Sequence, residues 1–253
     1  MTRLHGTKEF WLAHLRADAA AFDAAAVEAP PDAPVPSCPD WTATHLINHL
    51  ASVYAWTQAI VARGDTDRPE PRRDPDGPAD HAEALAGWRT AYAGLLSTLE
   101  GVDPETPVWN WAPQSKRAGF WDRRMAHETA IHRWDMQMAI PAVEPIEAKL
   151  AADGVTEVLD TWLPAGRRRS TDRPTGVVHL VAADASQEWL VRLRGEGVAL
   201  LDTDTVFDHD EPHARVQALG SASDLLLALY GRVGFDVLEL AGDAALLEGL
   251  RTG

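Results

Sequence analysis

The chain has 253 residues, 45% of them hydrophobic, which is enough for one large domain or two ordinary ones with real cores. Acidic residues outnumber basic ones by 38 to 23, and a formal net charge of −15 disfavours binding to a nucleic-acid backbone. A single cysteine, Cys38, excludes an internal disulfide and fits a reducing cytoplasm. No apolar run approaches the roughly 20 residues that span a bilayer, and the start lacks the apolar core of a signal peptide. We therefore predict a cytoplasmic protein that binds neither nucleic acid nor membrane.

Residues 1–145 are predicted to form one domain, a bundle of four helices. Apolar residues recur there at helical spacing, and Thr7 and Thr42 are the expected caps of the first two helices. The proline-rich segments 29–36 and 64–79 separate the first three helices, because proline interrupts a helix interior. The expected helices cover about residues 8–22, 43–60, 81–99 and 120–139.

The pattern changes after Pro145, and residues 146–253 are predicted to form a second, α+β domain. A helix over 147–162 is expected first, followed by short β-like runs that form a small, mostly antiparallel sheet with helices on one side. Ser221 or Ser223 is the expected cap of a helix that reaches Tyr230. The expected strands are 176–181, 188–193, 198–201, 214–218 and 237–240, and a short helix is expected from Ala244.

The fourth helix carries polar residues on a face that is otherwise apolar. Glu128 and His132 are four residues apart, so their side chains lie one turn above the other, and Asp135 shares their face. A carboxylate and an imidazole that point into a bundle core cost several kcal/mol unless they are paired. A metal ion or a hydrogen-bonded polar network would provide that pairing, although a simple pair on the helix surface gives the same spacing.

His49 lies on the inward stripe of the second helix, and helices of a bundle can contribute ligands to a shared interior site. Two histidines and one carboxylate suit zinc, and three protein ligands leave a fourth position open, as in catalytic sites. Nickel and iron would accept the same ligands. A hydrogen-bonded core histidine is the alternative interpretation of His49. His45 and His127 point elsewhere and are not predicted to be ligands.

Two further residues near this cluster have open interpretations. Asp135 follows His132 by three residues and would either orient its imidazole, as metal sites usually require, or form a salt bridge to Arg124, Arg133 or another cation. Cys38 would be a reactive thiol, a metal ligand or, as nothing near it in sequence would lower its pKa, a small buried hydrophobe.

Three separated segments resemble the mycothiol-dependent maleylpyruvate isomerase branch of the DinB-like metalloenzyme superfamily. The segments are Cys38-Pro39-Asp40-Trp41-Thr42 with Leu46-Ile47-Asn48-His49-Leu50, then Arg124 to Asp135, then Gly220 to Arg232. They occur in the family's order, and the resemblance extends over nearly the whole chain. His45 stands where the family often has Asp, at a position we expect to be a cap or a surface contact, and the loop 103–119 looks specific to this chain.

The resemblance implies a DinB-like metal-binding bundle followed by a sterol-carrier-protein-like α+β domain. It implies that His49, Glu128 and His132 bind zinc, with water as the fourth ligand, displaced by the thiolate of mycothiol. It also implies that Arg232 reaches the active site and holds a substrate carboxylate, a task that suits a guanidinium fork. The alternative for Arg232 is an ordinary charge at a helix end after Gly231.

The expected function is therefore thiol chemistry on a small electrophilic substrate, with the protein a monomer or a homodimer. Thiolate addition and elimination would isomerise a cis double bond. The same ligands would serve a mycothiol S-transferase that acts on electrophilic xenobiotics, in which the thiol stays attached. A metal-binding module without turnover is the third alternative. The resemblance favours the isomerase.

Overall fold

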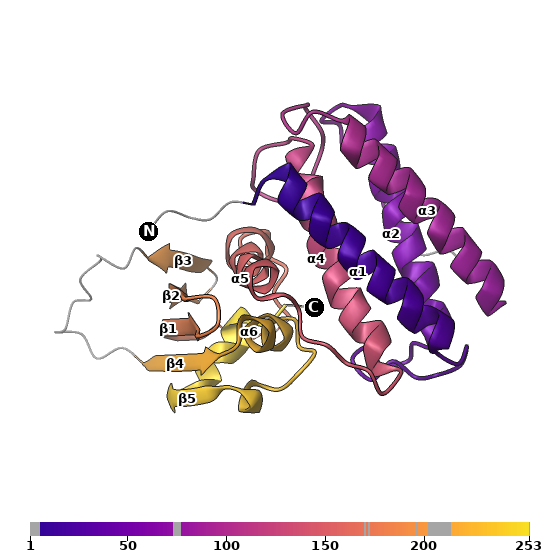
Figure 1. Cartoon of the computed structure of the whole chain (residues 1–253). Helices are drawn as coiled ribbons and strands as arrows, with labels where there is room; N and C mark the ends of the chain where they lie inside the picture. Colours follow the sequence, from indigo (N-terminus) through magenta and orange to yellow (C-terminus); the bar gives the residue numbers. More distant parts are fainter. Residues whose placement is uncertain are drawn as a thin grey trace. The chain divides into compact units, whose positions relative to one another are not determined.

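The structure is a computed structural model that describes residues 6–72, 77–169, 171, 173–195, 197–201 and 214–252. The chain divides into two compact units, Gly6–Glu144 and Pro145–Gly253, shown in Figure 1. The first unit is helical and the second contains a small mixed sheet, which confirms the predicted fold class. The predicted domain boundary after residue 145 lies next to this division. Among the described residues, no helix is both long and apolar enough to cross a membrane.

Four helices form the N-terminal unit, close to the predicted positions. Thr7 caps the first helix by accepting from the backbone N–H of Phe10. Thr42 caps the second and exchanges hydrogen bonds with His45 in a capping box, so His45 is the cap contact that the sequence predicted. The helices are α1 (Lys8–Glu28), α2 (Ala43–Arg63), α3 (His81–Gly101) and α4 (Gly119–Met138).

The core of the N-terminal unit lies between two helix pairs, α1 with α4 and α2 with α3. Each fully buried large apolar side chain contributes about 1.5–3 kcal/mol through the hydrophobic effect. Buried residues lie on both sides of α4, so this helix is buried nearly all round. The large buried side chains of this core include Leu15, Phe22, Leu46, Leu50, Tyr54, Trp88, Leu95, Trp121 and Met125.

The connection between α1 and α2 is a tight loop that positions Ser37 and Cys38. Its two ends are tied by a β-bridge between Pro34 and Thr42. The backbone N–H of Val35 also donates to the carbonyl of Trp41 at 3.0 Å. The loop therefore holds its tip at the start of α2, one to two turns before His49.

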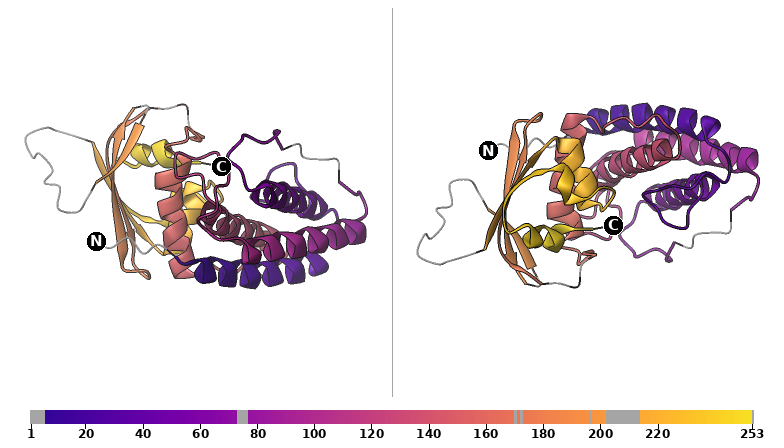
Figure 2. Two further views of the ribbon diagram at one scale, coloured as in Figure 1. Left: turned by 90° about the horizontal axis from the view of Figure 1, so that it is seen from above. Right: turned by 90° about the horizontal axis from the view of Figure 1, so that it is seen from below.

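The C-terminal unit is a five-stranded sheet in the order β3-β2-β1-β4-β5. Only β1 and β4 pair in parallel, so the sheet is mostly antiparallel, as predicted. Figure 2 shows the helices of this unit on one side of the sheet. The elements are α5 (Ala148–Glu157), which continues as a π-helix over Val158–Trp162, β1 (Thr175–Ala182), β2 (Gln187–Arg194), β3 (Gly197–Leu201), β4 (Arg215–Gly220), α6 (Ala222–Leu229), a 3₁₀ turn (Phe235–Val237), β5 (Glu239–Gly242) and a 3₁₀ helix (Ala244–Leu250).

The last strand begins later than predicted. Residues expected to begin it at 237 complete a 3₁₀ turn instead, and β5 begins at Glu239. Leu238 is buried against Gly220, where a methyl group added to the glycine would lie 2.5 Å from a Leu238 carbon. Because Leu238 turns inward to fill this space, regular strand geometry starts after it. The β4–β5 register then pairs Leu219 with Glu239.

Candidate metal centre

Helix α4 places Glu128, His132 and Asp135 on one face, as the sequence predicted. The helix passes through the interior of its unit, and His132 and Asp135 are 6% and 0% exposed. Side chains four residues apart on a helix are neighbours, so Glu128 Oε1 lies 3.4 Å from His132 Nε2. The polar face is therefore an interior cluster and not a pair on the helix surface.

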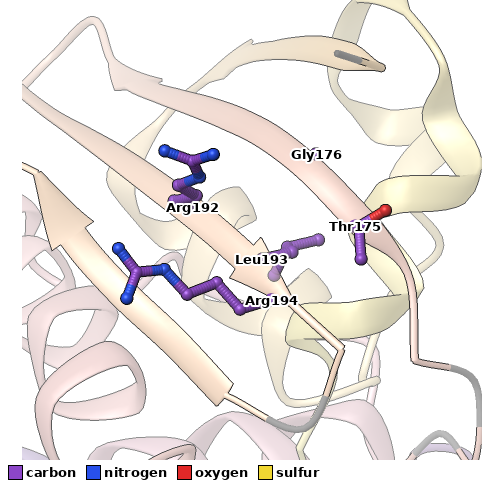
Figure 3. A pocket seen from close by; sticks show the side chains of 5 residues that line it. All are labelled: Thr175, Gly176, Arg192, Leu193 and Arg194. Atoms are coloured by element: carbon purple, nitrogen blue, oxygen red, sulfur yellow. The ribbon is translucent and has the colours of Figure 1, made fainter. Parts of the chain in front are cut away.

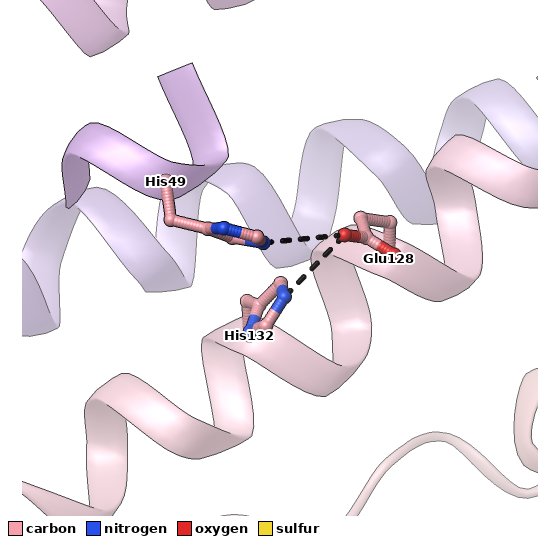
Figure 4. Close-up of side chains that lie close together, drawn as sticks. All are labelled: His49, Glu128 and His132. Carbon is pink, nitrogen blue, oxygen red and sulfur yellow. Dashed lines mark ion pairs between the residues drawn. The ribbon is translucent and has the colours of Figure 1, made fainter. Parts of the chain in front are cut away.

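His49 joins this cluster from α2. Its Nε2 lies 3.8 Å from Glu128 Oε1, and Figure 4 shows both imidazoles directed at the same carboxylate oxygen. One donor atom from each of the three residues lies within 4.8 Å of the other two. Among the described residues, this is the one group of three or more His, Cys, Asp or Glu side chains that meets that geometry. The structure brings the three predicted ligands together, and their role as ligands stays a prediction.

The electrostatics of the cluster prepare two of its groups for a cation. Burial lowers the pKa of His49, so its imidazole is neutral near pH 7. Burial alone would raise the pKa of Glu128. Hydrogen bonds to His132 and His49, together with the charge of Arg124, outweigh burial and hold that pKa well below its usual range. A neutral imidazole and an ionised carboxylate are the forms that bind metals.

Asp135 contacts His132 directly. Its Oδ2 accepts a hydrogen bond from His132 Nδ1 at 2.9 Å, since an ionised carboxylate can only accept. This leaves His132 Nε2 directed at Glu128. The two arginines named as alternative partners of Asp135 also contact other carboxylates. Arg124 donates to Glu128 at 2.9 Å, and Arg133 donates to Asp18 at 3.0 Å. The contact with His132 fits the first of the two predicted roles, and the role of Asp135 stays a prediction.

The loop before α2 supplies two further partners of Asp135. Ser37 Oγ donates to Asp135 Oδ1 at 2.6 Å, and Cys38 Sγ donates to Oδ2 at 3.6 Å. Cys38 is half-buried and packs against the hydrophobic core of its unit, as a small hydrophobic residue would. Cys38 is outside the group of close metal-binding atoms.

Two contacts of the cluster were not predicted from the sequence, that of Arg124 with Glu128 and that of Ser37 with Asp135. Arg124 could have been found, because it precedes Glu128 by one helical turn and pairs with it at 2.9 Å. The Trp41 ring lies 4.6 Å from the His49 ring, and Ser37 donates to Asp135 from the same loop before α2. No spacing rule relates these loop residues to α4. His127, which was not predicted to be a ligand, is buried with its ring 5.6 Å from that of Trp11.

Arg232 lies in the C-terminal unit, directly after α6. The chain turns there at Gly231, whose φ of 69° favours glycine. The Arg232 backbone N–H donates to the Leu227 carbonyl at 2.8 Å, and its guanidinium donates to the Tyr230 carbonyl at 3.2 Å. These bonds hold the Arg232 backbone and one guanidinium nitrogen at the helix end. Its predicted contact with a substrate stays a prediction.

The sheet of the C-terminal unit carries a separate hollow, shown in Figure 3. It has a volume of about 390 Å³ and contains none of the predicted site residues. Two of its side chains, Arg192 and Arg194, come from alternate positions of β2. It is lined by Thr175, Gly176, Arg192, Leu193 and Arg194.

Fold and site together define a protein with a helical unit that holds a His-Glu-His cluster, followed by a mixed-sheet unit. A family model described as the mycothiol maleylpyruvate isomerase N-terminal domain matches residues 12–137. A second, described as the C-terminal domain of the same family, matches residues 149–249. The two models together match most of the chain, which therefore belongs to the mycothiol-dependent maleylpyruvate isomerase family.

Two solved structures with the same fold are named as mycothiol-dependent maleylpyruvate isomerases. A mycothiol-dependent maleylpyruvate isomerase is 16% identical with a TM-score of 0.62, and the alignment covers 93% of both chains. A histidine-to-alanine mutant of a mycothiol-dependent maleylpyruvate isomerase is 15% identical with a TM-score of 0.63 and the same coverage. At these identities the likeness shows the fold. Comparison with curated proteins gives no significant match.

Proposed function

We propose that this protein is a zinc-dependent enzyme that uses mycothiol as a cosubstrate to isomerise a maleylpyruvate-type cis double bond to trans. The observation that carries the proposal is the convergence of His49, Glu128 and His132, from two helices, in a chain of this family. The structural neighbours named as mycothiol-dependent isomerases support the same reaction.

The three side chains fit a catalytic zinc ion. Two imidazole nitrogens and one carboxylate oxygen are a ligand set of catalytic zinc sites, in which a fourth position remains for water or substrate. The side chains of His49 and Glu128 are 15% and 17% exposed, so small molecules can reach the cluster from solvent. Nickel or iron would accept the same donors, and zinc is proposed because two imidazoles and one carboxylate form a known ligand set of catalytic zinc.

When bound, zinc would lower the pKa of a coordinated thiol, so that thiolate forms at neutral pH. The residues of the chain supply the surroundings for this chemistry. Glu128 contributes one negative charge, and its bond to Arg124 holds the carboxylate in place. Asp135 holds the Nδ1–H of His132 and so keeps Nε2 directed at the cluster. Arg232 is proposed to bind a carboxylate of the substrate.

The reaction balances without any other reactant. The thiolate sulfur forms a bond to one carbon of the double bond, and the π electrons move to the conjugated carbonyl to give an enolate. Rotation then occurs about the resulting carbon–carbon single bond. The enolate re-forms the double bond in the trans geometry and expels the thiolate. Mycothiol is regenerated, and no atom is gained or lost.

The test uses the purified protein, with its metal content measured first, and maleylpyruvate with and without mycothiol. The expected result is about one zinc per chain and isomerisation that requires the thiol. If the protein contains zinc but mycothiol does not promote conversion of maleylpyruvate, the isomerase function is excluded. If the protein then joins the thiol to another electrophile, it is an S-transferase. If it forms no product with any electrophile, it is a metal-binding module without turnover.

A further inference from the structure

One face of the sheet in the C-terminal unit is not covered by the helices of that unit (Figure 2). Along β2, Trp189, Val191 and Leu193 are buried, whereas Arg192 is half-buried and Arg194 is exposed. Successive side chains of a strand point to opposite faces of a sheet, so the two arginines share the face away from these helices. Both line the hollow of about 390 Å³ shown in Figure 3.

The strand register brings a hydroxyl beside the two arginines. Thr175 of β1 is the cross-strand partner of Arg194. The Cβ atoms of directly paired residues lie about 5 Å apart, and residues two apart on a strand are separated by about 7 Å. The long side chains of Arg192 and Arg194 can therefore reach the same small group, with the Thr175 hydroxyl next to it.

Neither of these two guanidiniums is neutralised by its surroundings. Among the described residues, none pairs with Arg192 or Arg194 through a hydrogen bond or an ion pair. Glu188, the acidic residue of β2, lies on the same face but four residues from Arg192, a separation of about 13 Å along the strand. Its carboxylate is paired with His179 at 2.8 Å. Two positive charges at the hollow are therefore available to an external anion.

Further positive charge lies at the same end of the sheet. Arg168 Nη1 donates to the carbonyl of Gly195, the residue after Arg194, at 2.9 Å. The opposite end of the face is acidic, because the register aligns Glu188 of β2 with Glu239 of β5 across β1 and β4. A face with both signs of charge does not suit a nucleic-acid backbone or an anionic membrane, which favour a broad basic surface. The positive charge is instead confined to the hollow.

The charge and shape of the hollow favour a phosphate group. A phosphate monoester carries nearly two negative charges at neutral pH and has three strong acceptor oxygens. A guanidinium can bind two phosphate oxygens at once through parallel N–H groups, and the Thr175 hydroxyl can donate to another. A single carboxylate would leave one of the two positive charges unbalanced. The volume of about 390 Å³ lies in the range of small-molecule sites and leaves room for an organic group beside the phosphate.

We propose that this hollow binds the phosphate group of a small, soluble phosphate monoester through Arg192 and Arg194. The inference goes beyond the proposed isomerase, because the hollow lies in the other unit and contains none of the predicted metal ligands. Arg192 and Arg194 also lie outside the three segments that carry the family resemblance.

The experiment measures the dissociation constant of methyl phosphate at pH 8 and low salt, by nuclear magnetic resonance titration of the full-length protein. The variants are Arg192→Gln, Arg194→Gln, the double variant and Arg194→Lys. Arg68→Gln is the matched control, because Arg68 is an exposed arginine of the other unit and its loss changes the net charge equally. Succinate, a dianion with two carboxylates, and vesicles of phosphatidylglycerol are the comparison ligands.

We expect the double variant to bind methyl phosphate about tenfold or more weakly than the wild type, and each single Gln variant about threefold or more weakly. Arg194→Lys should fall between the wild type and Arg194→Gln, because an ammonium keeps the charge but loses the fork. Arg68→Gln should change binding less than about twofold, since exposed charges more than a Debye length away are largely screened. Succinate should bind the wild type more weakly than methyl phosphate.

The inference is overturned if the wild type does not bind methyl phosphate, or if the double variant binds it equally well. Equal affinity for succinate would show a general anion site and would contradict the phosphate class. Binding to the vesicles without binding to methyl phosphate would identify a membrane surface instead. Circular dichroism checks the fold of each variant. If the double variant does not fold, Arg194→Gln decides, because that side chain is exposed.

Discussion

Two histidine–carboxylate pairs of almost equal length lie in the two units of this protein. His132 and Asp135 are 2.9 Å apart in the helical unit, and His179 and Glu188 are 2.8 Å apart on the sheet. The side chains of the first pair are 8% and 0% exposed, and those of the second are 28% and 38% exposed. A short distance alone therefore does not distinguish a candidate site.

The surroundings make the difference between the pairs. His132 has Glu128 and His49 on its other side, so its second nitrogen faces two more donor groups. The second nitrogen of His179 is 3.2 Å from an amide, that of Gln217. Solvent screens the sheet pair, while the buried pair must satisfy its charges internally. Changes to the buried cluster should consequently have large effects, and changes to the sheet pair small ones.

The largest expected effect is that of His132→Ala, which removes a predicted ligand. Metal content should fall from about one zinc per chain to near zero. Thiol-dependent turnover should fall about 1000-fold or more, because the metal-activated thiolate is lost. Elemental analysis and the isomerase assay measure the two effects. His179→Ala is the matched control, and stoichiometric, undiminished zinc in His132→Ala would contradict the ligand assignment.

Asp135→Asn should have the next largest effect. The amide keeps the shape of the carboxylate but loses the charge that orients the His132 imidazole. Loss of such a partner typically weakens metal binding by about 10–100-fold. Chelator competition measures the zinc affinity, and circular dichroism checks the fold. An affinity equal to that of Glu188→Gln, the corresponding change on the sheet, would show that Asp135 has no orienting role.

Asp122 offers a third kind of carboxylate, buried without a partner. It is 1% exposed, and among the described residues neither of its oxygens has a hydrogen-bond partner. Burial raises its pKa to about 7, against a partial opposing effect from Lys8. The folded state therefore keeps a proton that the unfolded state loses above about pH 4. Stability should fall as pH rises from about 4 to 7 and then level off.

Asp122→Asn should remove that pH dependence. We expect the variant to be more stable than the wild type by about 4 kcal/mol at pH 8, because a pKa raised from 3.8 to about 7 corresponds to about 1.4 kcal/mol for each pH unit between them. At pH 4 the two proteins should be nearly equal. Urea unfolding at both pH values measures the difference. A variant that is less stable at pH 8 would mean that the ionised carboxylate has a stabilising role.

The smallest expected effect is that of Glu188→Gln. The side chain of Glu188 is partly exposed, and exposed ion pairs contribute about 0–1 kcal/mol. The variant should unfold within about 0.5 kcal/mol of the wild type, with unchanged zinc content. A destabilisation of more than 2 kcal/mol would show that the sheet face is more protected than its exposure indicates, and would weaken the contrast between the two pairs.

Local sequence patterns predicted most of the fold. Helical spacing and capping residues such as Thr42 depend on neighbours within about one turn, so they are visible in the sequence. The same holds for Glu128 and His132, whose shared face follows from their separation of four residues. The position of β5 was wrong because Leu238 fills the space above Gly220, which no alternation pattern records.

The sequence by itself determined the two-part architecture, the polar face of α4 and, through three family-like segments, the set of predicted ligands. Only the tertiary structure decided at what distances other groups meet that face: His49 at 3.8 Å from Glu128 and Ser37 at 2.6 Å from Asp135. The physical reason is the separation along the chain between the residues that interact. Periodicity and capping act between residues a few positions apart, whereas loops reach a site through packing and long-range hydrogen bonds that leave no regular spacing along the chain.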